Sequence, residues 1–230
     1  MNPMCLVLLA IGQHPQYPII ILSNRDEFYN RTKAPAHFWP DPGIYSGNDL
    51  AAGGTWLGIN KTGQFSLLTN YRNPELHKTT NLSRGLLVKN FLEDPHLSPA
   101  KYIQQIAKYS NNYNPFNLIV GNMRDIIYYS NITNKATPLT KGIYGISNHL
   151  LDTPWYKVIK AKNLLNNMLN ELVKLEDPMI IRDILATILE DKTSSPDNLV
   201  PQTGVPLELE YSLGCIFVDI PDYQYGTRKF

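Results

Sequence analysis

The chain has 230 residues, 43% of them hydrophobic, and its 21 basic and 20 acidic side chains leave a net charge of +1. This length can bury a large core, and the balanced charge argues against a nucleic-acid or anionic-membrane partner. The two cysteines are far apart and lack metal-ligand spacing, which predicts a cytoplasmic protein with no disulfide and no metal site. No apolar run approaches the roughly 18 to 20 residues of a membrane span, so no stable membrane insertion is expected.

Three hairpins are predicted in the first 131 residues. The apolar opening "MCLVLLAIG" lacks the basic region of a signal peptide, so residues 4–11 predict a strand that pairs antiparallel with residues 18–23 across the turn "GQHPQY". The second hairpin joins residues 55–59 to 64–70, with turn residues at 60–63. The third joins residues 116–122 to 126–131.

Helices are predicted between and after these hairpins. Residues 82–94 and 98–110 form amphipathic segments, the second with Ser98 as N-cap and Pro99 in its first turn. A period of 3.6 residues predicts a long helix from Pro154 to about Glu176, and Asp177-Pro178 begins another that ends before "KTSSPDN".

The apolar run "LGCIFVDI", residues 213–220, predicts a last strand. Nothing marks a domain boundary, so we predict one domain over residues 1–230. Hairpins combined with a helical block indicate an α+β fold. Because strands such as "LVLLAI" are apolar on both faces, two sheets sandwiched between helix layers are expected.

Cys5 is the first candidate for chemistry. A cysteine in an apolar strand is often only a small core residue. If the residues before it were removed, by processing or by a start at Met4, its α-amine would lie beside its own thiol and could act as a general base near neutral pH.

The charged end of the second strand is the other candidate. Antiparallel pairing of the first two strands returns residues 23–26 to the start of strand one, near Cys5. A guanidinium at Arg25 would lower the thiol pKa, and the Asp26 carboxylate could hold an ammonium group. The alternative is a strand-end ion pair of little energetic effect.

Six ordered motifs carry a resemblance that covers nearly the whole chain: "SNRDEFYNR", "GGTWLGIN", "LTNY", "FNLI", "YGISNHLLDTPWYK" and "YGTR". In these the sequence resembles the NRDE family, also called the transport and Golgi organization family. The resemblance implies a four-layer αββα sandwich, the N-terminal-nucleophile (Ntn) hydrolase-like fold, similar to penicillin V acylases and bile-salt hydrolases.

The resemblance also implies roles for particular residues. Cys5 matches the nucleophile, and Arg25 and Asp26 match an arginine and an aspartate around it. Asn148 resembles an oxyanion-hole donor, with Asn70 as a second donor.

Arg228 is similar to a late arginine that lines the same site, and we expect it to lie close to a frayed chain end. As a ligand-binding set we predict Cys5, Asn24, Arg25 and Asn148. The five histidines show no metal spacing.

Two functions follow from the resemblance. The first is an intracellular protein that binds and traffics a small hydrophobic molecule at Cys5, either haem or an acyl-coenzyme A or other lipid, with no cofactor required. The alternative is an N-terminal-cysteine amidohydrolase that cleaves a small non-peptide amide. We prefer the binding protein because Cys5 is internal in the printed sequence and then has no α-amine to act as base.

Overall fold

The structure, a computed structural model, describes residues 5–40, 43–79 and 82–228. The chain divides into two compact units. The first combines residues 1–30 with residues 141–229, and the second consists of residues 31–140. We describe each unit by itself, and the single domain over residues 1–230 stays a prediction.

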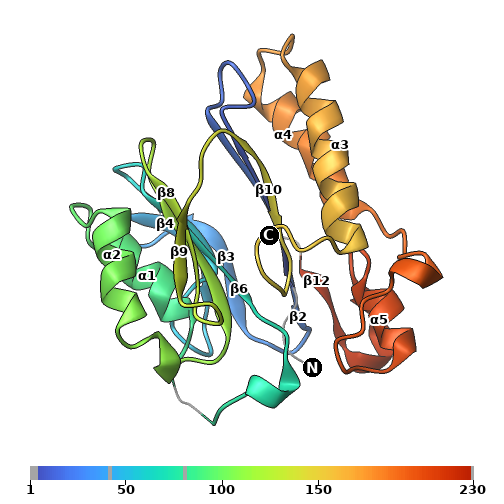
Figure 1. The fold of residues 1–230 in the computed structure, drawn as a ribbon. Coiled ribbons are helices and arrows are strands. Elements are labelled where there is room, and N and C mark those ends of the chain that lie inside the picture. Colours follow the sequence, from blue (N-terminus) through green and yellow to red (C-terminus); the bar gives the residue numbers. More distant parts are fainter. Residues whose placement is uncertain (1–4, 41–42, 80–81, 229–230) are drawn as a thin grey trace. The chain divides into compact units, whose positions relative to one another are not determined.

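The first unit is built on a five-stranded antiparallel sheet with the strand order β10-β1-β2-β12-β11 (Figure 1). Its strands are β1 (Cys5–Ile11), β2 (Ile19–Phe28), β10 (Gly142–Ile146), β11 (Asp219–Ile220) and β12 (Tyr225–Arg228). The β1–β2 hairpin therefore lies in the middle of the sheet, between strands from the far end of the sequence.

Helices cover one face of this sheet. They are α3 (Tyr156–Leu172), α4 (Pro178–Ala186) and α5 (Leu207–Leu213), and a 3-10 turn, Thr187–Glu190, continues α4. Leu6, Leu8 and Ala10 of β1 pack with Val158 and Leu165 of α3 in one hydrophobic core. Since side chains alternate along a strand, Cys5, Val7 and Leu9 point to the other face.

The second unit holds a seven-stranded antiparallel sheet whose strands follow one another in sequence order from β3 to β9. They are β3 (Lys33–Phe38), β4 (Ile44–Asp49), β5 (Leu57–Asn60), β6 (Phe65–Asn70), β7 (Phe116–Gly121), β8 (Ile126–Ser130) and β9 (Lys135–Pro138). Every strand pair in this unit is thus formed by strands that are consecutive in the chain, although α1 and α2 come between β6 and β7.

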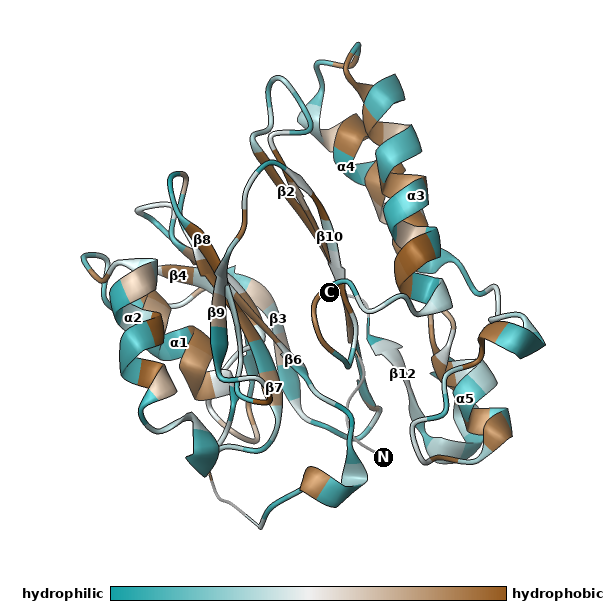
Figure 2. Cartoon of the chain, in the orientation of Figure 1, coloured by the Kyte–Doolittle hydropathy of each residue, from teal (hydrophilic) through white to brown (hydrophobic). Residues whose placement is uncertain are grey.

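Two helices, α1 (Gly85–Glu93) and α2 (Pro99–Ala107), cover one face of the second sheet. Ser98 caps α2 by accepting a hydrogen bond from the Lys101 backbone N–H, as expected. The start of α1 packs closely against the chain at Gly54. This contact requires glycine, because a Cβ on Gly54 would lie 2.6 Å from the Gly85 carbonyl carbon. Figure 2 shows hydrophobic and hydrophilic residues mixed on these helices, typical of elements with one buried face.

The α+β class with two antiparallel sheets and helices is confirmed, as are the three predicted hairpins. The predicted strand over residues 213–220 is wrong: α5 ends at Leu213, Gly214 caps it, and only Asp219–Ile220 is a strand. Ile216 and Val218 are buried without sheet pairing: Ile216 packs with α3 and α4, and Val218 packs with Tyr225. An apolar run alone does not distinguish these outcomes.

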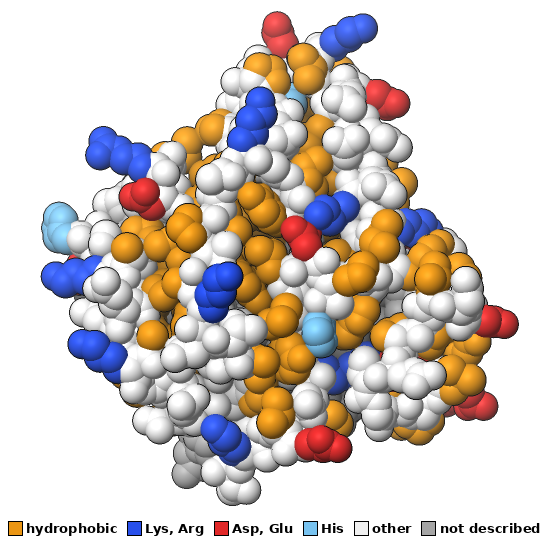
Figure 3. Space-filling model, in the orientation of Figure 1, with side chains coloured by type: hydrophobic (Ala, Val, Ile, Leu, Met, Phe, Trp, Pro, Cys, Tyr) orange, Lys and Arg blue, Asp and Glu red, His pale blue; other side chains and the backbone are white. Residues whose placement is uncertain are grey.

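No helix within the described ranges is long and apolar enough to cross a membrane. In the same part of the chain, no group of three or more His, Cys, Asp or Glu side chains is placed to hold a metal ion. On the face seen in Figure 3, basic and acidic side chains are interspersed, in keeping with the net charge of +1.

Candidate functional site

Four of the predicted site residues lie in one row across the first sheet. Cys5 pairs with Arg25, and Arg25 pairs on its other side with Arg228. In the pairing of β1 with β10, Val7 lies opposite Ile146. Two residues beyond this pair, the same register brings Asn148 opposite Cys5. We call Asn148, Cys5, Arg25 and Arg228 the Cys5 row.

Hydrogen bonds fix Cys5 to the segment after β10. The Cys5 backbone N–H donates to Asn148 Oδ1 at 3.0 Å, and Ser147 Oγ donates to the Cys5 carbonyl at 2.9 Å. Cys5 and Asn148 are both buried. The main chain at Cys5 is therefore held on both sides of the Cα, which sets the position of the thiol.

The acidic partner of Arg25 is Glu27, and not the adjacent Asp26. Its guanidinium forms an ion pair with Glu27 at 3.0 Å, and both side chains are buried. Arg25 and Glu27 are two residues apart on one strand, so they share a face of the sheet with Cys5. A buried ion pair of this kind contributes little net stability, but loss of either partner would leave an uncompensated buried charge.

Asp26 belongs to the opposite face. Strand alternation places its side chain on the side covered by helices, where Thr227 Oγ1 donates to Asp26 Oδ1 at 2.6 Å. Asp26 Oδ2 is buried and has no hydrogen-bond partner among the described residues. Burial raises the pKa of Asp26 to about 6, although the charge of Lys157 and the bond from Thr227 lower it.

Asp26 nevertheless acts on Cys5 across the thickness of the strand. Burial, with a smaller contribution from the charge of Asp26, raises the pKa of the Cys5 thiol to about 12. The charge of Arg25 lowers this pKa, as expected, and so does a backbone hydrogen bond from Asp26, but burial outweighs both. At neutral pH only about one thiol in 10⁵ is therefore ionised.

Lys157 is a residue of this region that we did not predict. It lies in the first turn of α3, is buried, and donates from Nζ to the Leu213 carbonyl at 2.9 Å. Its charge is the main influence that lowers the pKa of Asp26. The available signal was its place as the last residue of the motif "YGISNHLLDTPWYK".

The Asn24 side chain is hydrogen-bonded to the main chain of the protein. Its Nδ2 donates to the Leu189 carbonyl at 2.8 Å and to the Ile216 carbonyl at 2.9 Å, which ties β2 to two segments far along the sequence. These bonds use both amide hydrogens of Asn24. Its ligand-binding role stays a prediction.

Asn70 and Arg228 are the last two predicted site residues, and Arg228 is also part of the Cys5 row. Asn70 ends β6 in the second unit, paired with Phe116, and its role as a second oxyanion donor stays a prediction. Arg228 Nη1 donates to the Tyr29 carbonyl at 3.0 Å, and its guanidinium lies 5.4 Å from the centre of the Tyr29 ring. Arg228 is thus held by Tyr29. The neighbouring residues 229–230, like Met1 to Met4, lie outside the described residues.

Comparison with known proteins identifies the family. Residues 4–230 match the family model described as "Transport and Golgi organisation 2" (TANGO2). The chain belongs to the TANGO2 family. Among TANGO2 relatives, the proteins of Bos taurus and Homo sapiens are each 33% identical over 243 residues, covering 98% of this chain and 86% of the relative. The Drosophila melanogaster protein is 25% identical, with 98% and 85% coverage.

Solved structures also show a likeness to this TANGO2 chain. One is the Caenorhabditis elegans ortholog of N-acylethanolamine-hydrolyzing acid amidase, with a TM-score of 0.49, 13% identity, and coverage of 90% of this chain and 96% of that chain. Another is penicillin V acylase from Agrobacterium tumefaciens, with a TM-score of 0.46, 11% identity, and coverage of 89% and 76%.

Proposed function

We propose that this TANGO2-family protein binds a small hydrophobic ligand that carries an anionic group, at the Cys5 row. The observation that carries the proposal is the protonated thiol: with a pKa of about 12, Cys5 is a poor nucleophile at neutral pH. A neutral thiol on a strand whose neighbour carries Arg25, with Arg228 next in the same row, suits recognition of an anion better than acyl transfer.

Haem and long-chain acyl-coenzyme A are the candidate ligands, each carried as cargo. Haem offers propionate groups and acyl-coenzyme A offers phosphates, so both suit an arginine partner. A cysteine thiolate is a known axial ligand of haem iron, and such ligation at Cys5 would require loss of the thiol proton. Both cysteines of the described chain are free, which supports a cytosolic location for this activity.

Titration of haem and of palmitoyl-coenzyme A into the 230-residue protein tests the proposal. We expect saturable binding of at least one ligand, weakened by Cys5→Ala or by Arg25→Ala. Cys215→Ala is the matched control for the first variant, because Cys215 is the other buried free cysteine. Arg182→Ala, at an exposed arginine of α4, is the control for the second. Binding that both site variants leave unchanged, or no binding of either ligand, contradicts the proposal.

One observation favours an amidohydrolase as the second candidate. The Cys5 nitrogen lies 3.0 Å from Asn148 Oδ1, so an α-amine at that position would be held by Asn148 beside its own thiol. That amine would accept the thiol proton as Sγ forms a bond to the substrate carbonyl carbon. The proton would then pass to the leaving nitrogen as the C–N bond breaks, and water would hydrolyse the thioester.

A form that begins at Cys5 separates the two candidates. We expect it to cleave small amides that the 230-residue form leaves intact, because only the shorter form has an α-amine to act as base. A panel of fatty-acid amides and phenylacetyl amides, followed by release of the free amine, gives the readout. Equal turnover by both forms, abolished in each by Cys5→Ser, would show that the amine is not the base.

A further inference from the structure

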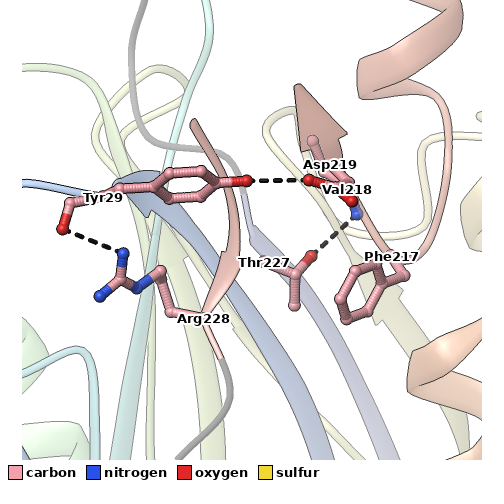
Figure 4. Close-up of a pocket in the computed structure, with 6 residues that line it drawn as sticks. All are labelled: Tyr29, Phe217, Val218, Asp219, Thr227 and Arg228. Carbon is pink, nitrogen blue, oxygen red and sulfur yellow. Dashed lines mark hydrogen bonds between the residues drawn. The ribbon is translucent and has the colours of Figure 1, made fainter. Parts of the chain in front are cut away.

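The edge of the first sheet contains a pocket that shares Arg228 with the Cys5 row and includes none of the other residues of that row. It has a volume of about 430 Å³, within the range of small-molecule sites. Its lining residues are Tyr29, Phe217, Val218, Asp219, Thr227 and Arg228 (Figure 4). All six belong to the first unit, and they come from the end of β2, from β11 and the segment before it, and from β12.

The floor of this pocket is fixed by bonds between β12 and the segment before β11. Val218 N–H donates to Thr227 Oγ1 at 2.8 Å, and Thr227 N–H donates to the Val218 carbonyl at 2.7 Å. Thr227 Oγ1 in turn donates to the buried Asp26. Because these polar groups are hydrogen-bonded to one another, the floor of the pocket is already ordered before any ligand binds.

The walls combine aromatic rings with cations. Tyr29 OH donates to Asp219 Oδ1 at 2.9 Å, while Arg228 holds the other end of the same residue through its carbonyl. Lys192 Nζ lies 4.9 Å from the centre of the Phe217 ring and 3.8 Å from Asp219 Oδ2. The lining therefore holds one cation, Arg228, and one carboxylate, Asp219, and Lys192 lies next to the lining residues Phe217 and Asp219.

Arg228 supplies the group that would recognise a ligand. A guanidinium has five N–H donors in a planar fork, and the bond to the Tyr29 carbonyl uses one of them. The fork matches the oxygen pair of a carboxylate or a phosphate. Asp219 is already balanced by Tyr29 OH and Lys192, so it adds little repulsion toward an anion.

We propose that this pocket is a binding site for a small oxyanion, a carboxylate or a phosphate monoester, attached to a flat apolar body. The anion bonds to Arg228, and the flat body lies against the rings of Tyr29 and Phe217. The site shares Arg228 with the Cys5 row but does not include Cys5, so the proposal does not depend on whether the thiol acts in binding or in amide cleavage.

Calorimetric titration with four probes tests the site: 2-naphthoate, 1-naphthyl phosphate, the neutral 2-naphthalenemethanol and inorganic phosphate. We expect the two naphthyl anions to bind more tightly than the alcohol and than inorganic phosphate. The more tightly bound of the two anions identifies carboxylate or phosphate as the preferred group. Equal binding of the alcohol and the anions, or binding of none of the probes, would overturn the proposal.

Variants locate the binding. Arg228→Ala should weaken both naphthyl anions by about 10- to 100-fold, the usual effect of losing a hydrogen-bonded charged partner. Phe217→Leu should weaken the naphthyl anions without changing inorganic phosphate. Arg182→Ala, which removes an exposed arginine on α4, should change neither.

Arg228→Lys keeps the proposal testable if the alanine variant does not fold. It retains the positive charge and removes the fork, so we expect binding weaker than in the wild type, with an unchanged circular dichroism spectrum. Wild-type affinity in Arg228→Lys, or in a folded Arg228→Ala, would show that Arg228 does not hold the anion.

Discussion

Replacement of Asp26 by asparagine should remove a measurable part of the pH dependence of stability. Burial raises the pKa of Asp26 from its ordinary value of 3.8 to about 6 in the folded chain. The folded state therefore binds this proton more tightly than the unfolded state. The resulting stabilisation is fully present below pH 3.8 and is lost as pH rises through about 6.

The magnitude follows from the two pKa values. A difference of about two pKa units corresponds to ~3 kcal/mol in total, of which about 1.4 kcal/mol is lost between roughly pH 5 and pH 7.5. Asp26→Asn keeps an oxygen that can accept the Thr227 hydroxyl bond, yet it cannot titrate. Asp26→Asn also removes the negative charge that faces Lys157, which changes the free energy of unfolding at every pH. The informative quantity is therefore the change of this free energy with pH.

Urea denaturation at a series of pH values from 5 to 7.5 measures this quantity. The unfolding free energy of the wild type, minus that of Asp26→Asn, should fall by about 1.4 kcal/mol across the series. Asp183→Asn, at an exposed aspartate of α4, should follow the wild type throughout. If the wild type and Asp26→Asn run parallel, Asp26 titrates as it does in the unfolded chain and the argument from burial is refuted.

Three further predictions concern the thiol, its main-chain partner and the core. Cys5 should react with iodoacetamide at pH 7.5 about 10³-fold more slowly in the folded protein than in urea, by mass spectrometry, because its pKa of about 12 keeps it protonated; similar rates would contradict this. Asn148→Ala should lose about 1 to 3 kcal/mol of unfolding free energy, because the Cys5 N–H loses its acceptor; a loss under ~0.5 kcal/mol would mean that this bond adds little. Leu165→Ala, in the core under α3, should cost about 2 to 5 kcal/mol, against less than ~0.5 kcal/mol for the exposed Leu207→Ala.

Local signals predicted the elements whose partners lie nearby in the chain. The β1–β2 hairpin and the cap of α2 follow from turn chemistry, apolar pattern and Ser98, which act over a few residues. The neighbourhood of Cys5 and Arg25 follows in turn from that hairpin. The family resemblance supplied Asn148 and Arg228, whose places in the Cys5 row depend on strand pairs with no local signature.

Elements with distant partners were missed for the same reason. β12 has four residues, and its long-range pairing with β2 completes it as a strand. β3 was missed for another reason: its partner β4 is the next strand, but β3 contains Pro35 and exposed side chains, as an edge strand permits, so it carried no strand signal. Strand alternation could have predicted from the sequence that Asp26 lies on the opposite face of the sheet from Cys5. The effect of burial on the Cys5 pKa could not be predicted, because it depends on all the residues packed around the thiol.

The Cys5 row also bears on the order in which the chain folds. Cys5 and Asn148 are 143 residues apart, and Asp26 and Thr227 are 201 residues apart. During synthesis the β1–β2 hairpin is made first, but the outer edge of β2 stays open until β12 emerges from the ribosome, after every strand of the second unit. Contacts of such long range are slow to form, and an open edge is a site for mispairing. The strands made earliest are therefore the last to be completed, and the cell must protect them for almost the whole time that the protein is being made.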